Sequence, residues 1–379
     1  MGIKGTRWGC VMQVCFKVIR QSQTNAWVQT YLLDVEPSYT ILDCLNQIKW
    51  EQDGSLAFRK NCRNTICGSC GMRINGRSAL ACKENVGAEL ARLQSINSTV
   101  ISAENPANSA PLNPDRKSLP DASELIPEIT IAPMGNMPVI KDLIVDMQSF
   151  WDNLKAIDPY ISTRARQVPE REFLQTPEDR ARLDQTGNCI LCGACYSECN
   201  AREVNPGFVG PHALAKAYRM VADTRDDQTE TRLQQYSQGT DGVWGCTRCL
   251  YCNSVCPMDV APMDQIGNIK AAVLHQETIA ESRPIRHRRV LIDLVKEGGW
   301  IDERQFGLRV VGNSFRDLQG LVSLGPLGLR MLIRGKFPFG FEPSVGVEAV
   351  RSLIEAVQDL EAQGNPVSDS LMSEVFLKG

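Results

Sequence analysis

The sequence predicts an α+β protein in which a small sheet domain is followed by a helical domain and a helical extension. Two segments rich in β-branched and aromatic residues, 13–20 and 27–36, stand near the start with a polar turn between them. Beyond residue 176, apolar residues recur at helical spacing. The chain also has fifteen cysteines, most of them in regular runs, which indicates that metal-binding loops join these elements.

The bulk composition limits what the protein can be. Its 379 residues can hold two or three domains, and we expect them at 12–135, 136–282 and 283–379. A net charge of −3 argues against a nucleic-acid binder. The first eleven residues lack an apolar signal-peptide core, so the cysteine runs favour metal binding in a reducing compartment over disulfides. Met1 and Met12 are both candidate starts.

The first part of the chain has the element order that opens a β-grasp domain. The two strands form a hairpin, and Thr40 then caps a helix whose apolar residues within 41–48 share one face. Asp53 and the glycine after it end this helix. A closing strand is expected at 128–133, after a loop insertion at 101–122 that is rich in Pro, Asn and Ser.

A cysteine motif follows the first helix, in the stretch FRKNCRNTICGSCGMRINGRSALAC. Its spacing, Cys-x4-Cys-x2-Cys and a fourth cysteine after eleven more residues, is the plant-type [2Fe–2S] pattern. Gly68 and Gly71 allow the loop to fold tightly, so that N–H groups can point at sulfur. A structural zinc site is the weaker alternative, because zinc sites rarely have such uneven spacing. The expected ligands are Cys62, Cys67, Cys70 and Cys82.

The second half contains two runs of the form Cys-x2-Cys-x2-Cys-x3-Cys, and the second begins 57 residues after the first. This is the ligand pattern of a bacterial two-cluster ferredoxin, in which the fourth cysteine of each run binds the other cluster. We expect amphipathic helices between the cluster loops, at 190–198, 211–223, 227–236 and 262–277. The two runs are Cys189, Cys192, Cys195, Cys199 and Cys246, Cys249, Cys252, Cys256.

Further helices are expected on either side of these runs. A helix is predicted at 138–157, and Thr176 with the proline after it gives a strong helix start. Residues 283–340 hold eleven Lys or Arg against five Asp or Glu. They form either an ordinary extension with a solvated charged face or a docking surface for a partner subunit or membrane headgroups. The last helices are expected near 346–362 and 368–377.

Together these motifs resemble the iron–sulfur subunits of succinate dehydrogenase and fumarate reductase over about residues 12–280. Besides the [2Fe–2S] stretch, the resemblance rests on ITIAPMGNMPVIKDLIVDM, CILCGACYSEC, NPGFVGPHALAKAYR and CTRCLYCNSVCPMDVAP. It implies a respiratory, tricarboxylic-acid-cycle oxidoreductase in which an FAD-containing flavoprotein subunit handles succinate. This chain would then hold no catalytic residue and would pass electrons through three clusters to quinone at a membrane anchor. It would be peripheral, on the cytoplasmic face, since no apolar stretch approaches the ~20 residues of a membrane helix.

The resemblance also distributes the ligands. It implies a [2Fe–2S] cluster on the four cysteines of the first motif and a [4Fe–4S] cluster on Cys189, Cys192, Cys195 and Cys256. The third cluster would be held by Cys199, Cys246 and Cys252. Most of the family lacks a cysteine at the place of Cys249 and has [3Fe–4S] there. We expect Cys249 to complete a second [4Fe–4S] cluster; the alternative is a buried thiol beside a [3Fe–4S] cluster.

Other departures concern the exit of electrons. The family's quinone pocket has Pro, Trp and His residues where this chain has Asn200, Glu203, Val204 and Thr247, which puts the usual quinone site in doubt. The tail segments RHRRVLIDLVKEGGWIDE and LGPLGLRMLIRGKFPF resemble the C-type component of heterodisulfide reductase, another double-cubane protein. This second resemblance implies a partner of the heterodisulfide-reductase B type in place of the usual anchor.

Three other functions compete with electron transfer from succinate. The chain could be the iron–sulfur subunit of a fumarate reductase, or of a flavoenzyme of the heterodisulfide-reductase or glycolate-oxidase type. A metal-binding protein or an iron–sulfur sensor is the alternative from a different class. Of the remaining candidate residues, we expect Cys10, Cys15 and Cys44 not to bind iron, and His212 to cap a helix or lie near a cluster. His287 is left unassigned.

Overall fold

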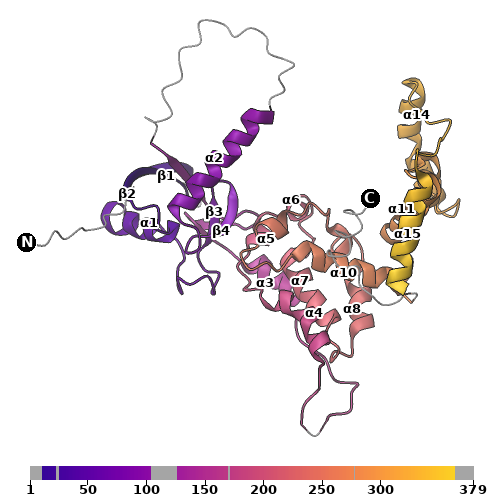
Figure 1. Ribbon diagram of the computed structural model, residues 1–379, viewed down its shortest axis with the longest axis horizontal. Helices are drawn as coiled ribbons and strands as arrows, with labels where there is room; N and C mark the ends of the chain where they lie inside the picture. The colour runs from indigo at the N-terminus through magenta and orange to yellow at the C-terminus, as the bar shows by residue number, and fades with distance from the viewer. Residues whose placement is uncertain (1–10, 23–24, 104–125, 170, 277, 363–379) are drawn as a thin grey trace, which may run out of the picture. The chain divides into compact units, whose positions relative to one another are not determined.

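The computed structural model describes residues 11–22, 25–103, 126–169, 171–276 and 278–362 (Figure 1). The chain divides into two compact units, Met1–Gln276 and Glu277–Gly379. The predicted sheet and helical domains both lie in the first unit, and the boundary between them at residue 135 stays a prediction.

The first unit begins with a five-stranded sheet of order β2-β1-β5-β3-β4. β1 and β2 form the predicted antiparallel hairpin, and β1 pairs in parallel with β5, with Cys15 opposite Glu128. β5 is antiparallel to β3, so the late strand joins the two hairpins into one sheet. The strands are β1 (Met12–Gln21), β2 (Ala26–Val35), β3 (Gly71–Ile74), β4 (Arg77–Leu80) and β5 (Glu128–Ala132).

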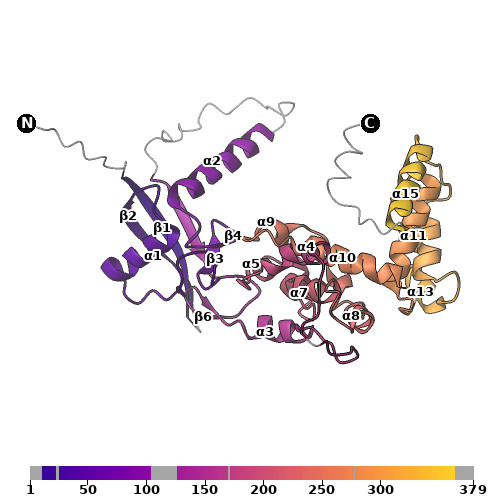
Figure 2. The same ribbon diagram turned by 60° about the horizontal axis from the view of Figure 1, so that its bottom comes forward.

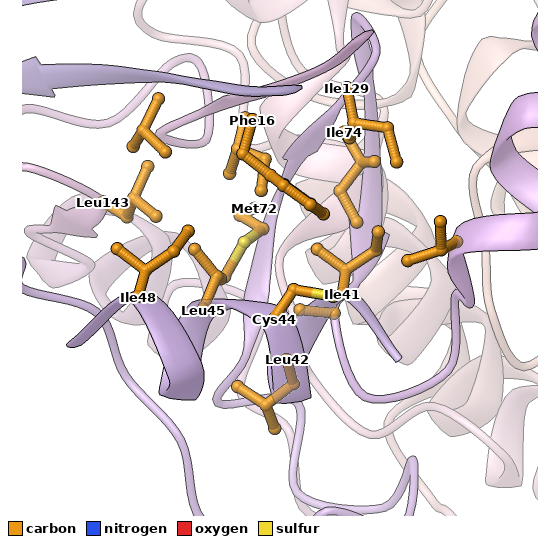
Figure 3. Packing of buried hydrophobic residues seen from close by; sticks show 14 of the residues in the cluster. Phe16, Ile41, Leu42, Cys44, Leu45, Ile48, Met72, Ile74, Ile129 and Leu143 are labelled. Atoms are coloured by element: carbon orange, nitrogen blue, oxygen red, sulfur yellow. The ribbon is translucent and has the colours of Figure 1, made fainter. Parts of the chain in front are cut away.

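Helix α1 (Ile41–Gln47) covers one face of this sheet. Figure 3 shows Ile41, Leu45 and Ile48 packed against Phe16 and neighbouring strand residues, all of them fully buried. The predicted start is confirmed. The Thr40 hydroxyl accepts a hydrogen bond from the Asp43 amide at 3.1 Å, and the Asp43 carboxylate accepts one from the Thr40 amide at 3.2 Å. Cys44 lies in the same core, as expected of a small apolar residue.

The prediction of a helix at 138–157 is wrong for the first half of that range. The chain there forms a small hairpin, β6 (Val139–Lys141) and β7 (Ile144–Val145), and becomes helical only in α3 (Gln148–Lys155). Asp142 at the turn has φ +50° and a buried side chain. Its carboxylate accepts hydrogen bonds from Arg20 Nε at 3.0 Å and from the Ala57 amide at 2.9 Å. These contacts with distant residues override the local helical pattern.

Two other expectations near the first domain change. Helix α2 (Val86–Ala103) was not predicted; the Asn85 side chain caps it by accepting a hydrogen bond from the Ala88 amide at 2.9 Å. The loop expected at 101–122 lies outside the described residues apart from its first three, which end α2.

The rest of the first unit is helical, and α7 packs along α10. The predicted helix at 190–198 is shorter, since only residues 194–197 are helical. The Thr176 cap is confirmed, because its side chain accepts a hydrogen bond from the Asp179 amide at 3.1 Å. The helices are α4 (Pro177–Gly187), α5 (Ala194–Ser197), α6 (Asn200–Val204), α7 (Pro211–Val221), α8 (Thr229–Tyr236), α9 (Tyr251–Ser254) and α10 (Pro262–His275), with a 3₁₀ turn at Val243–Gly245.

The second unit is a small helical assembly in which α11 and α15 run side by side (Figure 2). Among its described residues, a small core cluster is formed by Val290, Leu294 and Val310, with Phe306 against them. The helix expected at 368–377 lies outside the described residues. Among the described helices, none is long and apolar enough to cross a membrane. The helices are α11 (Arg283–Gly298), α12 (Glu303–Phe306), a π-helical turn at Gly307–Val311, α13 (Leu318–Ser323), α14 (Gly325–Ile333) and α15 (Val347–Ala362).

Candidate iron–sulfur centres

The first cysteine motif forms an irregular loop between α1 and β3 that presents backbone N–H groups to sulfur. The Asn64 amide donates to Cys62 Sγ at 3.3 Å, and the Thr65 amide donates to Cys82 Sγ at 3.4 Å. Thr65 itself has φ +57° and Arg63 has φ +58°, which turns these amides toward the sulfurs. Such bonds favour a thiolate and an added electron.

The two halves of this loop give their thiols different surroundings. Hydrogen bonds, the largest from the Ser69 side chain and the next from the Cys62 backbone, lower the pKa of Cys67 to about 6. Burial raises the pKa of Cys70 to about 12, and the Cys70 thiol interacts with the thiols of Cys82 and Cys67. The loop therefore brings all four predicted [2Fe–2S] ligands together.

The glycines of this loop have a second role that sequence reasoning missed. A Cβ on Gly68 would lie 2.8 Å from Cys192 Cα, and one on Gly71 would lie 3.2 Å from the Cys192 carbonyl oxygen. Gly68 also has φ +68°, a conformation that favours glycine. The [2Fe–2S] loop thus touches the backbone of the first cysteine run directly, and any side chain at Gly68 would separate them.

Three cysteines of the first run line a small cavity that we call the first cysteine cavity. The wall is completed by apolar residues and by His212 and Pro262 at the starts of α7 and α10. The fourth cysteine of the run, Cys199, does not belong to this cavity, and the last cysteine of the second run takes its place. The thiols in this wall are those of Cys189, Cys192, Cys195 and Cys256.

A second small cavity, the second cysteine cavity, is lined by the four remaining thiols. Its wall includes Pro211 of α7 and Met263 of α10, the counterparts of the residues that line the first cavity. Cys249 belongs to this wall although its side chain is exposed to solvent on the other side. The thiols are those of Cys199, Cys246, Cys249 and Cys252.

The backbone repeats at the same 57-residue offset as the cysteines. Leu191 has φ +56° and its counterpart Arg248 has φ +59°; Gly193 has φ +83° and its counterpart Leu250 has φ +64°. A single helical turn follows in both runs, α5 and then α9. The backbone on either side of Cys249 therefore has the same conformation as the backbone on either side of Cys192. Leu250 holds a conformation that costs a non-glycine residue roughly 1–2 kcal/mol, so the repeat is kept at an energetic cost.

The thiols of both cavities are chemically suited to iron–sulfur clusters. Burial raises the pKa of Cys192 to about 11 and that of Cys252 to about 12, and it raises the pKa of Cys195 further still. Such thiolates form only where a bound cation offsets their charge. In the described residues, no three His, Cys, Asp or Glu side chains converge closely enough to bind one metal ion; the thiols instead surround cavities.

Two lysines place their ammonium groups next to these cavities. Lys216 Nζ donates to the carbonyl oxygens of Thr186 and Cys189, at 3.3 and 3.4 Å. Lys270 Nζ donates to the Cys246 carbonyl oxygen at 3.1 Å. Each run thus has a lysine on the carbonyl of its first cysteine. Positive charge at these positions favours the more negative, reduced state of a bound cluster.

His212 lies in the wall of the first cavity rather than at the surface of its helix. Its ring stacks on Phe150 with centroids 3.9 Å apart, and Nε2 donates to the Phe150 carbonyl oxygen at 2.9 Å. Burial lowers the pKa of His212 to about 3, so the ring is neutral at pH 7. This placement agrees with the expectation that His212 lies near a cluster.

Two family models match the chain in the same order as its cysteine motifs: a 2Fe-2S iron-sulfur cluster binding domain over residues 15–152 and a 4Fe-4S dicluster domain over residues 185–260. The succinate dehydrogenase iron-sulfur subunit of Coxiella burnetii is 31% identical over 269 residues, which are 69% of this chain and 97% of that one. The fumarate reductase iron-sulfur subunit of Escherichia coli is 32% identical over 67% of this chain and 89% of its own length.

The chain belongs to the family of succinate dehydrogenase and fumarate reductase iron–sulfur subunits. Its fold agrees with this. A chain of the Mycobacterium smegmatis Sdh1 complex in the apo form matches 71% of this chain and 98% of its own length, with a TM-score of 0.54 and 22% identity. As a family member, the protein carries a [2Fe–2S] cluster in its sheet domain and a double-cluster domain behind it. The second unit, from Glu277 onward, lies beyond both family models.

Proposed function

We propose that this iron–sulfur protein transfers electrons from the FAD of a flavoprotein subunit to quinone at a membrane anchor, as part of a succinate dehydrogenase. The observation that carries the proposal is the serial contact of its centres. The [2Fe–2S] loop touches Cys192 of the first cysteine cavity through Gly68. Each cysteine run then contributes thiols to the walls of both cavities. Substrate chemistry belongs to the flavoprotein, and no catalytic residue is proposed on this chain.

The proposed ligands follow the groups that line each site. The clusters supply one-electron redox chemistry, and the chain's residues fix their places and potentials. Backbone N–H groups at Asn64 and Thr65 favour the reduced state of the first centre. The ligand sets are Cys62, Cys67, Cys70 and Cys82 for [2Fe–2S]; Cys189, Cys192, Cys195 and Cys256 for [4Fe–4S]; and Cys199, Cys246, Cys249 and Cys252 for the third cluster.

We propose that the third cluster is [4Fe–4S]. Cys249 lines the second cavity on a backbone that repeats that of Cys192, so it is placed to bind a fourth iron. Iron and acid-labile sulfide analysis should give about ten iron atoms per chain. EPR spectra of the intact air-oxidised protein should lack an oxidised [3Fe–4S] signal, and the appearance of that signal would sink the assignment.

The proposed direction of electron flow is tested with the flavoprotein partner. The chain co-purified with its flavoprotein subunit should show all three clusters reduced, wholly or in part, when succinate is added. Clusters that respond to dithionite but not to succinate would overturn the proposal. Because the relatives include fumarate reductase subunits, the reverse reaction, from reduced quinone to fumarate, is the second candidate. The ratio of the two rates decides between them.

We further propose that the membrane partner is of the heterodisulfide-reductase B type and that the complex sits on the cytoplasmic face. Support comes from the residues at the second cavity. Thr247 lines that cavity, and Val204 near it is almost fully exposed, where the family has quinone-site residues. Purification of the native complex followed by mass spectrometry should find a cysteine-rich partner. Recovery of a conventional multi-helix anchor alone would refute this proposal.

A further inference from the structure

The second unit has an apolar helix face on α14 that none of the unit's described residues covers. Leu329, Leu332 and Ile333 are 59%, 49% and 77% exposed. Their spacing of three and four residues places them on one side of the helix. On another side, Gly328 faces Phe337, which folds back against the helix after its end. The aliphatic side chains therefore point outward in a unit that has a small core of its own.

The segment that carries this face contains no acidic residue. From Leu318 to Phe341 the sequence has no Asp or Glu, while Arg330, Arg334 and Lys336 lie at the end of the apolar face. All three cations are exposed, and in the described part of the chain none of them forms an ion pair. Arg330 Nε only donates to the Pro326 carbonyl oxygen of its own helix, at 3.2 Å.

Many other cations of the same unit are arranged differently. Six of them have a carboxylate partner within 4.0 Å and so contribute little net positive field. These paired cations are Arg283, Arg286, Lys296, Arg304, Arg309 and Arg351. The unit thus neutralises these cations and leaves the three beside the apolar face uncompensated.

We propose that α14 with the turn after it, residues 325–339, is a lipid-docking element that lies in the headgroup region of an anionic membrane. Leu329, Leu332 and Ile333 would enter the boundary of the acyl chains. The long side chains of Arg330, Arg334 and Lys336 would reach back to lipid phosphates. Phe339, which is also exposed, would add an aromatic anchor. A row of cations with no acidic residue between them fits a uniformly anionic lipid surface.

This inference extends the proposed function, because quinone dissolves in the membrane that α14 would touch. Its evidence is independent of the clusters, however. Failure of membrane docking would leave the electron-transfer proposal intact, and the reverse is also true.

The test is flotation of the cluster-loaded full-length chain with vesicles. Phosphatidylcholine vesicles that contain about a third phosphatidylglycerol should bind the wild-type chain, and pure phosphatidylcholine should bind it far less. Leu332→Ser/Ile333→Ser should weaken binding roughly tenfold. Arg330→Gln/Arg334→Gln/Lys336→Gln should weaken it by about a hundredfold at low salt, since each cation contributes about a fivefold factor.

The matched control is Val168→Ser/Leu174→Ser in the first unit, where the side chains are 81% and 84% exposed but the neighbouring arginines are interspersed with the acidic residues Glu170 and Glu172. This variant should bind vesicles like the wild type. Far-UV circular dichroism and cluster absorbance should be the same in all variants. Wild-type chain that does not float with anionic vesicles, variants that float equally well, or docking that appears only with a purified protein partner would each overturn the proposal.

Discussion

The two cysteine cavities are built on the same backbone repeat, yet their surroundings differ. The first cysteine run contacts the [2Fe–2S] loop, since Gly68 lies against Cys192, and the wall of the first cavity contains the neutral ring of His212. At the equivalent place the second cavity has Met263, and its thiol Cys249 is exposed. The backbone geometry of the ligands is thus common to both cavities, while the exposure of their thiols to solvent differs.

This difference assigns the two cavities different places in electron transfer. A centre whose ligand run contacts another cluster loop is suited to pass electrons within the chain. A centre with an exposed ligand is suited to pass them to a partner. The repeat therefore explains how two clusters are held, and the neighbours of each cavity explain why the two are not interchangeable.

The largest expected effect comes from removing equivalent ligands. Cys192→Ala should abolish the first [4Fe–4S] cluster, a loss of about four iron atoms per chain, because the Cys192 backbone is fixed against Gly68 and the cavity wall has no fifth thiol to replace the lost ligand. Cys249→Ala should lose about one iron atom and give a [3Fe–4S] cluster, since three thiolates still hold the rest. Iron analysis and EPR of the oxidised proteins measure both outcomes.

The buried strand residue Cys15, changed to alanine, serves as the control and should leave the iron content unchanged. Equal iron losses from the Cys192 and Cys249 variants would contradict the difference in access. An unchanged iron content in the Cys249 variant would show that this thiol is not a ligand.

What the sequence could predict was mostly local. Cysteine spacings, the Thr40 cap and the strand pattern depend on residues near one another, and they led to the sheet, the main helices and the grouping of the thiols. The hairpin at 139–145 was missed because it depends on Asp142 and Arg20, which lie 122 residues apart. The role of Gly68 was only half predicted, since its contact with Cys192 joins distant parts of the chain.

A second prediction concerns the contact that only the first cavity has. Gly68→Ala should destabilise the protein by roughly 3 kcal/mol, because it adds overlap with the Cys192 backbone to an unfavourable φ. Gly76→Ala is the matched variant: Gly76 has φ +80° but no atom within 4 Å of a Cβ, so it should cost only about 1 kcal/mol. Urea midpoints, followed by cluster absorbance and circular dichroism, measure the difference, and equal midpoints would rule out the contact.

The smallest expected effect is on the reduction potentials of the two clusters, each of which has its own neighbouring lysine. Lys216→Met removes a charge beside the Cys189 carbonyl and should lower the reduction potential of the first [4Fe–4S] cluster by on the order of tens of millivolts. Lys270→Met should do the same to the third cluster alone, since its ammonium lies on the Cys246 carbonyl.

The sign of this shift follows from charge: a cation stabilises the reduced cluster, so its loss makes reduction harder. Burial lowers the pKa of Lys216, and the negative charge of a Cys189 thiolate opposes that shift. The positive charge of Lys216 therefore depends on the thiolate beside it. Lys216→Arg keeps a cation and should restore most of the potential. Redox titration followed by EPR resolves the clusters, and a shift of both potentials by either methionine variant would show that the two cavities share one electrostatic environment.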